Sequence, residues 1–231
     1  MLPEIIQTSD GSDTILNHDL NQHYHSVHGA VQESQHIFIE AGFRAAAGTF
    51  FHDGCDDRSA LRIFEMGFGT GLNALLTLRE AEKSGIRVHY TAIEAWPLEE
   101  QFWAALNYPQ LPGFADMSTD FARIHTAGWN MPVKITDRFT LFKIHGHLED
   151  YQPEAGSFRL VYFDAFDPEA QPELWTDTVF VRCFRSLVKG GIFVTYSVKG
   201  RIVRSMKAAG FVTEKLPGPP GKRHILRAMA P

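Results

Sequence analysis

The stretch Ile63–Leu76, IFEMGFGTGLNALL, decides the fold of this chain. Glycines occupy every second position at Gly67, Gly69 and Gly71, and Glu65 lies two places before the first of them. The run LRIFEM before the glycines is typical of a buried strand, and residues 71–83 after them are typical of a helix. A glycine loop between a strand and a helix marks the edge at which open α/β sheets bind ligands.

The spacing of the glycines bears on which ligand this loop holds. It differs from G-x-G-x-x-G, in which a helix N-terminus receives a pyrophosphate. S-adenosylmethionine has no phosphate and carries an ammonium, which favours a nearby carboxylate such as Glu65. We therefore predict an S-adenosylmethionine site, with an NAD-dependent dehydrogenase as an alternative. Its predicted residues are Glu65, Gly67, Phe68, Gly69 and Gly71, together with Glu94, which ends the next strand and suits ribose hydroxyls.

The rest of the chain predicts a mostly parallel sheet. Strand patterns at 61–66, 87–94, 138–146, 158–166 and 191–197 alternate with helical ones, including a helix over 173–188 closed by Gly190-Gly191. Two strands, 211–216 and 224–229, then flank a Gly/Pro-rich link and predict a terminal antiparallel hairpin. This combination indicates an α/β fold of the class I S-adenosylmethionine-dependent methyltransferase type, Rossmann-like, in residues 61–231.

Residues 1–60 are predicted to form an N-terminal extension. It would hold a hairpin around Asp10-Gly11, a short helix over 33–41 and a surface loop near residues 52–60. His23, His25 and His28 could suggest a metal, but no cysteine or carboxylate has matching spacing. We predict no metal, and a loop that folds over cofactor or substrate.

Composition narrows the setting and the partner. The 231 residues contain no apolar run of membrane-spanning length, no secretory signal pattern and two distant cysteines, which predicts a cytoplasmic protein with no membrane partner. Net charge is -5, yet Lys199 to Arg227 holds eight basic residues and one acidic residue, so this segment is +7 and the remainder -12. Such asymmetry suggests an anionic partner on one face.

Polar residues at the ends of later strands predict an acceptor site. Asp164 follows the buried run VYF and would emerge beside the glycine loop. An alkylamine is mostly protonated at neutral pH, so a carboxylate there could orient it and take its proton; a turn-capping aspartate is the structural alternative. Tyr196 and Ser197 could line the acceptor pocket, and His147 should lie near the adenine.

Several segments together resemble one family. They are YHSVHGAVQESQHIFI, EMGFGTGLNALLTL, AIEAWPL, FDAFDPEAQPELW and AAGFVTEKLPGPPGKRHIL. From about Tyr24 to the C-terminus the chain resembles the methyltransferase domain of the bacterial enzymes of tRNA 5-methylaminomethyl-2-thiouridine biosynthesis, the MnmC/MnmD family, in its stand-alone form. The phrase D-A-F-x-P followed by P-x-L-W is more specific than the glycine segment.

The resemblance implies methylation of the aminomethyl nitrogen at C5 of the wobble uridine, in the anticodon region of tRNA. Asp164 would act at the amine, and Lys222 and Arg223 would face tRNA phosphates. The bifunctional relatives carry an FAD-dependent oxidoreductase domain, so this chain is expected to hold no FAD and to work with a separate oxidase. Relatives often have Gly-Asp where Gly146-His147 stands, which leaves the adenine contact open.

Two other classes of function stay open at this point. One is a methyltransferase for a small-molecule or protein amine. The other is a non-catalytic protein that binds S-adenosylmethionine or tRNA. The complete glycine loop and Asp164 argue against the second class, because a sensor needs no acid beside the reacting methyl group.

Overall fold

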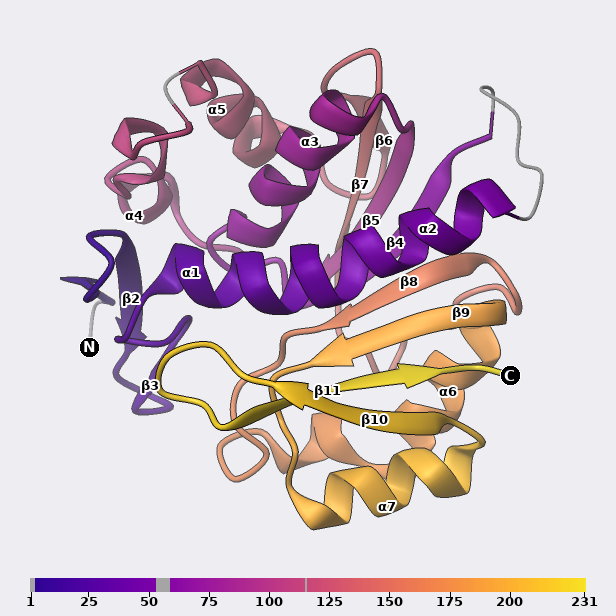
Figure 1. Cartoon of the computed structure of the whole chain (residues 1–231). Helices are drawn as coiled ribbons and strands as arrows, with labels where there is room; N and C mark the ends of the chain where they lie inside the picture. The colour runs from indigo at the N-terminus through magenta and orange to yellow at the C-terminus, as the bar shows by residue number, and fades with distance from the viewer. Residues whose placement is uncertain (1–2, 53–58, 115) are drawn as a thin grey trace.

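The computed structural model describes residues 3–52, 59–114 and 116–231, and its centre is an eight-stranded sheet in the order β10-β11-β9-β8-β4-β5-β7-β6 (Figure 1). Five neighbouring strands are parallel: β4 (Leu61–Met66), β5 (Val88–Glu94), β7 (Phe139–His145), β8 (Phe158–Phe163) and β9 (Leu187–Thr195). Three are antiparallel to their neighbours: β6 (Pro132–Lys134), β10 (Val212–Pro217) and β11 (His224–Met229). The predicted fold class is confirmed, including the C-terminal hairpin.

The N-terminal residues form a second, three-stranded sheet beside the ends at which β8 and β9 terminate (Figure 1). It consists of β1 (Glu4–Gln7), β2 (Asp13–Asn17) and β3 (Gln22–His23). The predicted turn at Asp10-Gly11 is confirmed, because Gln7 pairs with Asp13 across it and Gly11 has φ 83°. This small sheet is therefore placed next to the edge where a ligand binds in such folds.

A long helical rod covers one face of the large sheet (Figure 1). It runs through α1 (Ala30–Ser34), a π-helical stretch (Gln35–Phe43) and α2 (Arg44–His52), and α3 (Leu72–Ser84) and α5 (Ser118–Thr126) lie on the same side. The predicted helix over 33–41 was too short. Gly42, which costs about 1 kcal/mol in a helix, sits against the sheet, since a Cβ there would be 3.0 Å from Tyr162 Cε1. Close packing on the sheet thus outweighs the low helix propensity of glycine, and the helix continues.

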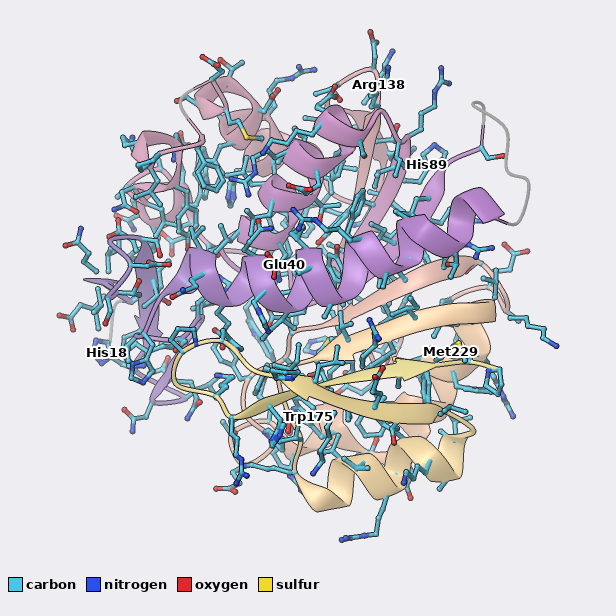
Figure 2. The ribbon with its side chains drawn as sticks, in the orientation of Figure 1. His18, Glu40, His89, Arg138, Trp175 and Met229 are labelled. Carbon is cyan, nitrogen blue, oxygen red and sulfur yellow. The ribbon has the colours of Figure 1, made fainter. Side chains whose placement is uncertain are left out.

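The opposite face is covered by α6 (Asp177–Ser186) and α7 (Gly200–Ala209), with a short 3-10 turn at Pro172–Trp175. Figure 2 shows Trp175 behind the strands and Glu40 on the rod in front of them. Successive side chains of each strand point to opposite faces of the sheet. Ile63 therefore packs with the rod, whereas Phe64 packs with Trp175 and α6. Short helices α4 (Glu100–Trp103) and η2 (Tyr108–Gln110) follow β5.

Two further expectations about local structure were wrong. Gly190-Gly191 do not close a helix: α6 ends at Ser186, and both glycines lie inside β9. Gly190 has φ 75° and donates its N–H to the Ala230 carbonyl at 2.7 Å, where β8 and β9 shift register. The glycines therefore mark a bulge, a second role that glycine pairs have in strands. Most of the predicted loop at 52–60 lies outside the described residues.

The division of the chain at residue 60 stays a prediction. Residues on both sides of it share one hydrophobic core, in which Ile37 and Phe43 of the rod pack with Leu61 and Ile63 of β4. In the part of the chain that the structure describes, no helix is both long enough and apolar enough to cross a membrane.

Candidate active site

A cavity of about 750 Å³ lies between the carboxyl ends of β4, β5, β7 and β8 and the N-terminal sheet. It is large enough for a nucleoside-sized cofactor and part of an acceptor. Eight of the sequence-predicted site residues line it: Gly67, Phe68, Gly69, Glu94, His147, Asp164, Tyr196 and Lys222. Four do not line it: Glu65, Gly71, Ser197 and Arg223.

The glycine loop packs closely against two other parts of the site. Gly67 has φ 87°, and a Cβ there would lie 3.0 Å from the Asp164 carbonyl oxygen. Gly69 has φ 49°, and a Cβ there would lie 2.9 Å from Tyr24 Cδ1. Both positions require glycine, because a positive φ is costly for other residues and a Cβ would lie too close to its neighbour. The backbone of the loop thereby faces the cavity directly.

Glu94 joins the glycine loop to the second strand. Its two carboxylate oxygens accept hydrogen bonds from the N–H groups of Gly69 and Trp96, each at 3.0 Å. Burial raises the pKa of Glu94, and these backbone donors act against that rise. A carboxylate offers about four acceptor directions, so Glu94 retains acceptor capacity toward the cavity. Free acceptor capacity is what hydrogen bonding to ribose hydroxyls requires.

Glu65 lies beneath the loop, away from the cavity. Its side chain is buried, and neither carboxyl oxygen has a hydrogen-bond partner among the described residues. Burial raises the pKa of Glu65 well above its usual value. Asn73 and Tyr90 act against this rise in pKa. Contact with the cofactor ammonium, direct or through water, stays a prediction for this residue.

Asp164 follows β8 at the centre of the site. Its N–H donates to the Met66 carbonyl at 3.2 Å, and its Oδ2 accepts from Asn73 Nδ2 at 2.8 Å. Burial, reinforced by the negative charge of Glu33, raises the pKa of Asp164 to about 7, against the opposing effects of Asn73 and Lys222. A carboxylate with this pKa can both hold and release a proton near neutral pH.

The loop after Asp164 is fixed in place from two sides. Trp175 Nε1 donates to the Phe166 carbonyl at 2.8 Å. Lys199 Nζ pairs with Asp167 at 2.9 Å and with Glu169 at 2.8 Å. Tyr196 Oη donates to the Ala165 carbonyl at 2.9 Å, which places the Tyr196 ring on the cavity. Ser197, by contrast, is buried next to it and outside the cavity lining, so the geometry does not support its predicted place in an acceptor pocket.

The segment from His23 to His28 packs over the glycine loop. His25 Nε2 lies 2.7 Å from Thr70 Oγ1, and burial lowers the pKa of His25 to about 4, so the ring is neutral. Tyr24 contacts Phe166 edge to face at a ring-centroid distance of 4.9 Å. His23 lines the cavity, and His28 is exposed beside Gly221. Within residues 3–52, 59–114 and 116–231, no group of three His, Cys, Asp or Glu is arranged to hold a metal ion.

The opposite end of the cavity carries an aromatic pair. His147 and Trp96 meet edge to face with ring centroids 5.1 Å apart, and both line the cavity. Trp96 is exposed, at 64% of its full accessible surface. Its position two residues after Glu94 puts it beside the place predicted for the ribose. Gly146 also lines the cavity there, and its N–H donates to the Glu94 carbonyl at 3.0 Å.

Among the lining residues that the sequence did not predict, five contact or flank the predicted ones: Tyr24, Glu33, Asn73, Trp96 and Phe166. Three of them carried a local signal. Asn73 follows the glycine loop by two places, and Trp96 and Phe166 stand two places after Glu94 and Asp164. Tyr24 and Glu33 come from the N-terminal segment, and only the folded chain brings them to the glycine loop.

The comparison with protein families decides the class of this site. Residues 115–231 match the family model described as S-adenosyl-L-methionine-dependent methyltransferase. The chain belongs to this family. The residues present fit the cofactor, because a loop without Cβ atoms at Gly67 and Gly69 lies beside a carboxylate with free acceptor capacity, that of Glu94, at one sheet edge. The predicted enzyme class and cofactor are thereby confirmed.

Curated relatives are similar over most of this chain. Two are the bifunctional protein MnmC of tRNA 5-methylaminomethyl-2-thiouridine biosynthesis from Magnetococcus marinus and from Aromatoleum aromaticum. The first is 32% identical over 90% of this chain and 31% of the relative, and the second is 30% identical over 88% and 32%. The chain thus spans about a third of the length of the curated relatives it matches.

Solved structures show the same fold. A crystal structure of MnmC2 from Aquifex aeolicus has a TM-score of 0.77 and 24% identity, covering 100% of this chain and 71% of that one. A spermidine synthase from Thermotoga maritima has a TM-score of 0.52 and 13% identity, covering 95% of this chain and 69% of that one. At these identities the likeness concerns the fold alone.

Proposed function

We propose that this protein transfers the methyl group of S-adenosylmethionine to the aminomethyl nitrogen at C5 of the tRNA wobble (2-thio)uridine, giving 5-methylaminomethyl-(2-thio)uridine. The observation that carries the proposal is the placement of Asp164. It lines the cavity next to the glycine loop, held by Asn73, with its pKa near neutrality. The names of the curated relatives support the same acceptor.

The chemistry requires an amine with a free lone pair. An alkylamine has a pKa of about 10.4 and an ordinary aspartate one of about 3.9, so proton transfer between them is uphill by roughly 6.5 pKa units. Raising the pKa of Asp164 to about 7 narrows the gap to roughly 3.4 units, which removes about 4 kcal/mol from that step. Asp164 therefore orients the amine and accepts its proton. The nitrogen then attacks the cofactor's methyl carbon in line, so that the C–N bond forms as the C–S bond breaks and the neutral thioether S-adenosylhomocysteine leaves.

Exposed cations of the C-terminal segment support tRNA as the substrate. Of the cations in the +7 segment, the exposed ones are Arg201, Arg204 and Lys207 on α7, Lys215 on β10, and Arg223 in the turn before β11. Lysine and arginine contacts to phosphate supply most nucleic-acid affinity. Other members of the segment are engaged within the protein, since Lys199, Lys222 and Arg227 all form ion pairs.

The aminomethyl group must be made before this enzyme acts. We propose that a separate FAD-dependent oxidoreductase, or a pathway that installs the group directly, supplies it, and that both steps take place in the cytoplasm on the anticodon region of tRNA. The relatives are named bifunctional, and this chain matches about a third of their length.

The test is incubation with labelled S-adenosylmethionine and either unmodified or aminomethylated tRNA, followed by nucleoside analysis. Label should appear as 5-methylaminomethyl-(2-thio)uridine only with the aminomethylated tRNA. Equal labelling of unmodified tRNA, or a higher kcat/KM for free small amines or for protein amines, would replace the wobble uridine with one of the other acceptor classes.

The pH dependence of the reaction should respond to Glu33. Activity requires ionised Asp164, so the rate is expected to rise with pH through about 7. The negative charge of Glu33 raises the pKa of Asp164, so Glu33→Gln should move this acid limb to lower pH. The measurement is kcat against pH, normalised to the plateau of each variant. The control, Glu214→Gln, removes an exposed carboxylate outside the cavity lining and should leave the acid limb of the pH profile in place. An acid limb that stays near pH 7 in Glu33→Gln would contradict its assignment to Asp164.

A further inference from the structure

The side-chain ammonium of Lys222 lies in the same cavity as Asp164, although Lys222 comes from the turn between β10 and β11. Its Nζ is 2.7 Å from Glu33 Oε1 on α1. The same atom is 5.2 Å from the centroid of the Tyr196 ring, which follows β9. Three distant parts of the chain therefore converge on one cation.

The partners of that cation are held rigidly. The Glu33 side chain is only 10% exposed, and its second oxygen accepts the Ser26 N–H at 2.8 Å. The Tyr196 hydroxyl is tied to the Ala165 carbonyl at 2.9 Å. A fixed carboxylate and the face of a fixed aromatic ring form a cation site, whichever cation fills it. Asp164 is adjacent, because both Glu33 and Lys222 act on its carboxyl electrostatically.

The chemistry of the resident cation matches that of the acceptor. A lysine side chain ends in CH2–NH3⁺, and an aminomethyl group ends in the same CH2–NH3⁺. We infer that Glu33 and Tyr196 form a primary-ammonium subsite beside Asp164, which Lys222 occupies and from which the acceptor amine displaces it. The identity of the acceptor in this inference rests on the proposed function.

This assignment differs from the role that sequence reasoning gave Lys222. A lysine that contacts tRNA phosphate should weaken tRNA binding when it is removed. A lysine that competes with the acceptor for Glu33 should do the opposite. Lys222→Met keeps an unbranched apolar chain against Tyr196 and removes the charge. The two roles therefore predict changes of opposite sign in the affinity for tRNA.

A direct test uses ethylammonium as the probe and needs no tRNA. Ethylammonium chloride is titrated into the full-length protein while the side-chain carboxyl resonances are followed by carbon-13 NMR, with sodium chloride at equal ionic strength as the blank. Lys222→Met should bind ethylammonium at least about tenfold more tightly than the wild type, and the double variant with Glu33→Gln should lose that gain. Arg227→Met breaks an ion pair of the same segment outside the cavity and should match the wild type.

The kinetic arm separates this inference from the proposed function. Lys222→Met should lower the KM for aminomethylated tRNA severalfold, with melting temperatures confirming that each variant is folded. Equal ethylammonium affinity in Lys222→Met and the wild type, or a raised KM, would overturn the subsite while leaving tRNA methylation by the wild type intact. Tight ethylammonium binding by Lys222→Met, in a protein whose wild type methylates no tRNA, would support the subsite and refute the tRNA acceptor.

Discussion

Asp164→Asn is expected to slow methyl transfer by about 10²- to 10⁴-fold, the usual contribution of a positioned general base. The isosteric amide retains an oxygen that can accept the hydrogen bond from Asn73, so the loop keeps its anchor. It cannot accept the amine proton, so the acceptor stays protonated and has no lone pair for attack. Affinity for S-adenosylmethionine should change by no more than a few-fold, because the cofactor contacts predicted from the glycine loop and Glu94 remain.

Single-turnover transfer from labelled S-adenosylmethionine to aminomethylated tRNA measures the rate, and calorimetry measures cofactor binding. Asp177→Asn is the matched control, since it makes the same change in the exposed first turn of α6, outside the cavity lining. A rate within threefold of the wild type would show that Asp164 is the turn-capping aspartate that the sequence also allowed. Loss of cofactor binding together with activity would instead point to collapse of the loop.

Much of the fold could be predicted from local sequence patterns. The strand before Gly67, the helix over Gly200–Ala209 and the hairpin strand His224–Met229 were all readable, because their apolar periodicity and flanking glycines act within a few residues. The same locality explains why the glycine loop and Asp164 were predicted to lie at one edge. Strands that are parallel and adjacent must bring their carboxyl ends together.

Contacts between distant segments were not readable. Nothing near Glu33 indicates that Lys222 pairs with it, and nothing near Tyr24 indicates that its ring covers Gly69. Charge counting placed Lys222 with the other cations of its segment, because a count does not distinguish a cation facing solvent from one facing a buried carboxylate. Glycine was ambiguous for a related reason, since the same residue ends a helix or allows a bulge according to what packs against it.

Glu94→Ala is expected to weaken S-adenosylmethionine binding by about 10- to 100-fold. Hydrogen bonds to a charged group contribute about 1.5–3 kcal/mol each, which corresponds to roughly 10- to 100-fold in affinity per bond. The variant loses the carboxylate that the ribose hydroxyls are predicted to meet. It also frees the Gly69 and Trp96 N–H groups that Glu94 holds at 3.0 Å, so the glycine loop loses its link to the second strand.

Calorimetric titration with S-adenosylmethionine gives the dissociation constant, and kcat at saturating cofactor should remain within a few-fold because Asp164 is untouched. Glu99→Ala, an exposed residue of the same loop outside the cavity lining, serves as the control and should bind the cofactor normally. An unchanged dissociation constant in Glu94→Ala would mean that cofactor binding depends neither on a ribose contact nor on the loop link that Glu94 provides. Comparing the two variants tests the specific contacts of Glu94, because the loss of one negative charge is common to both.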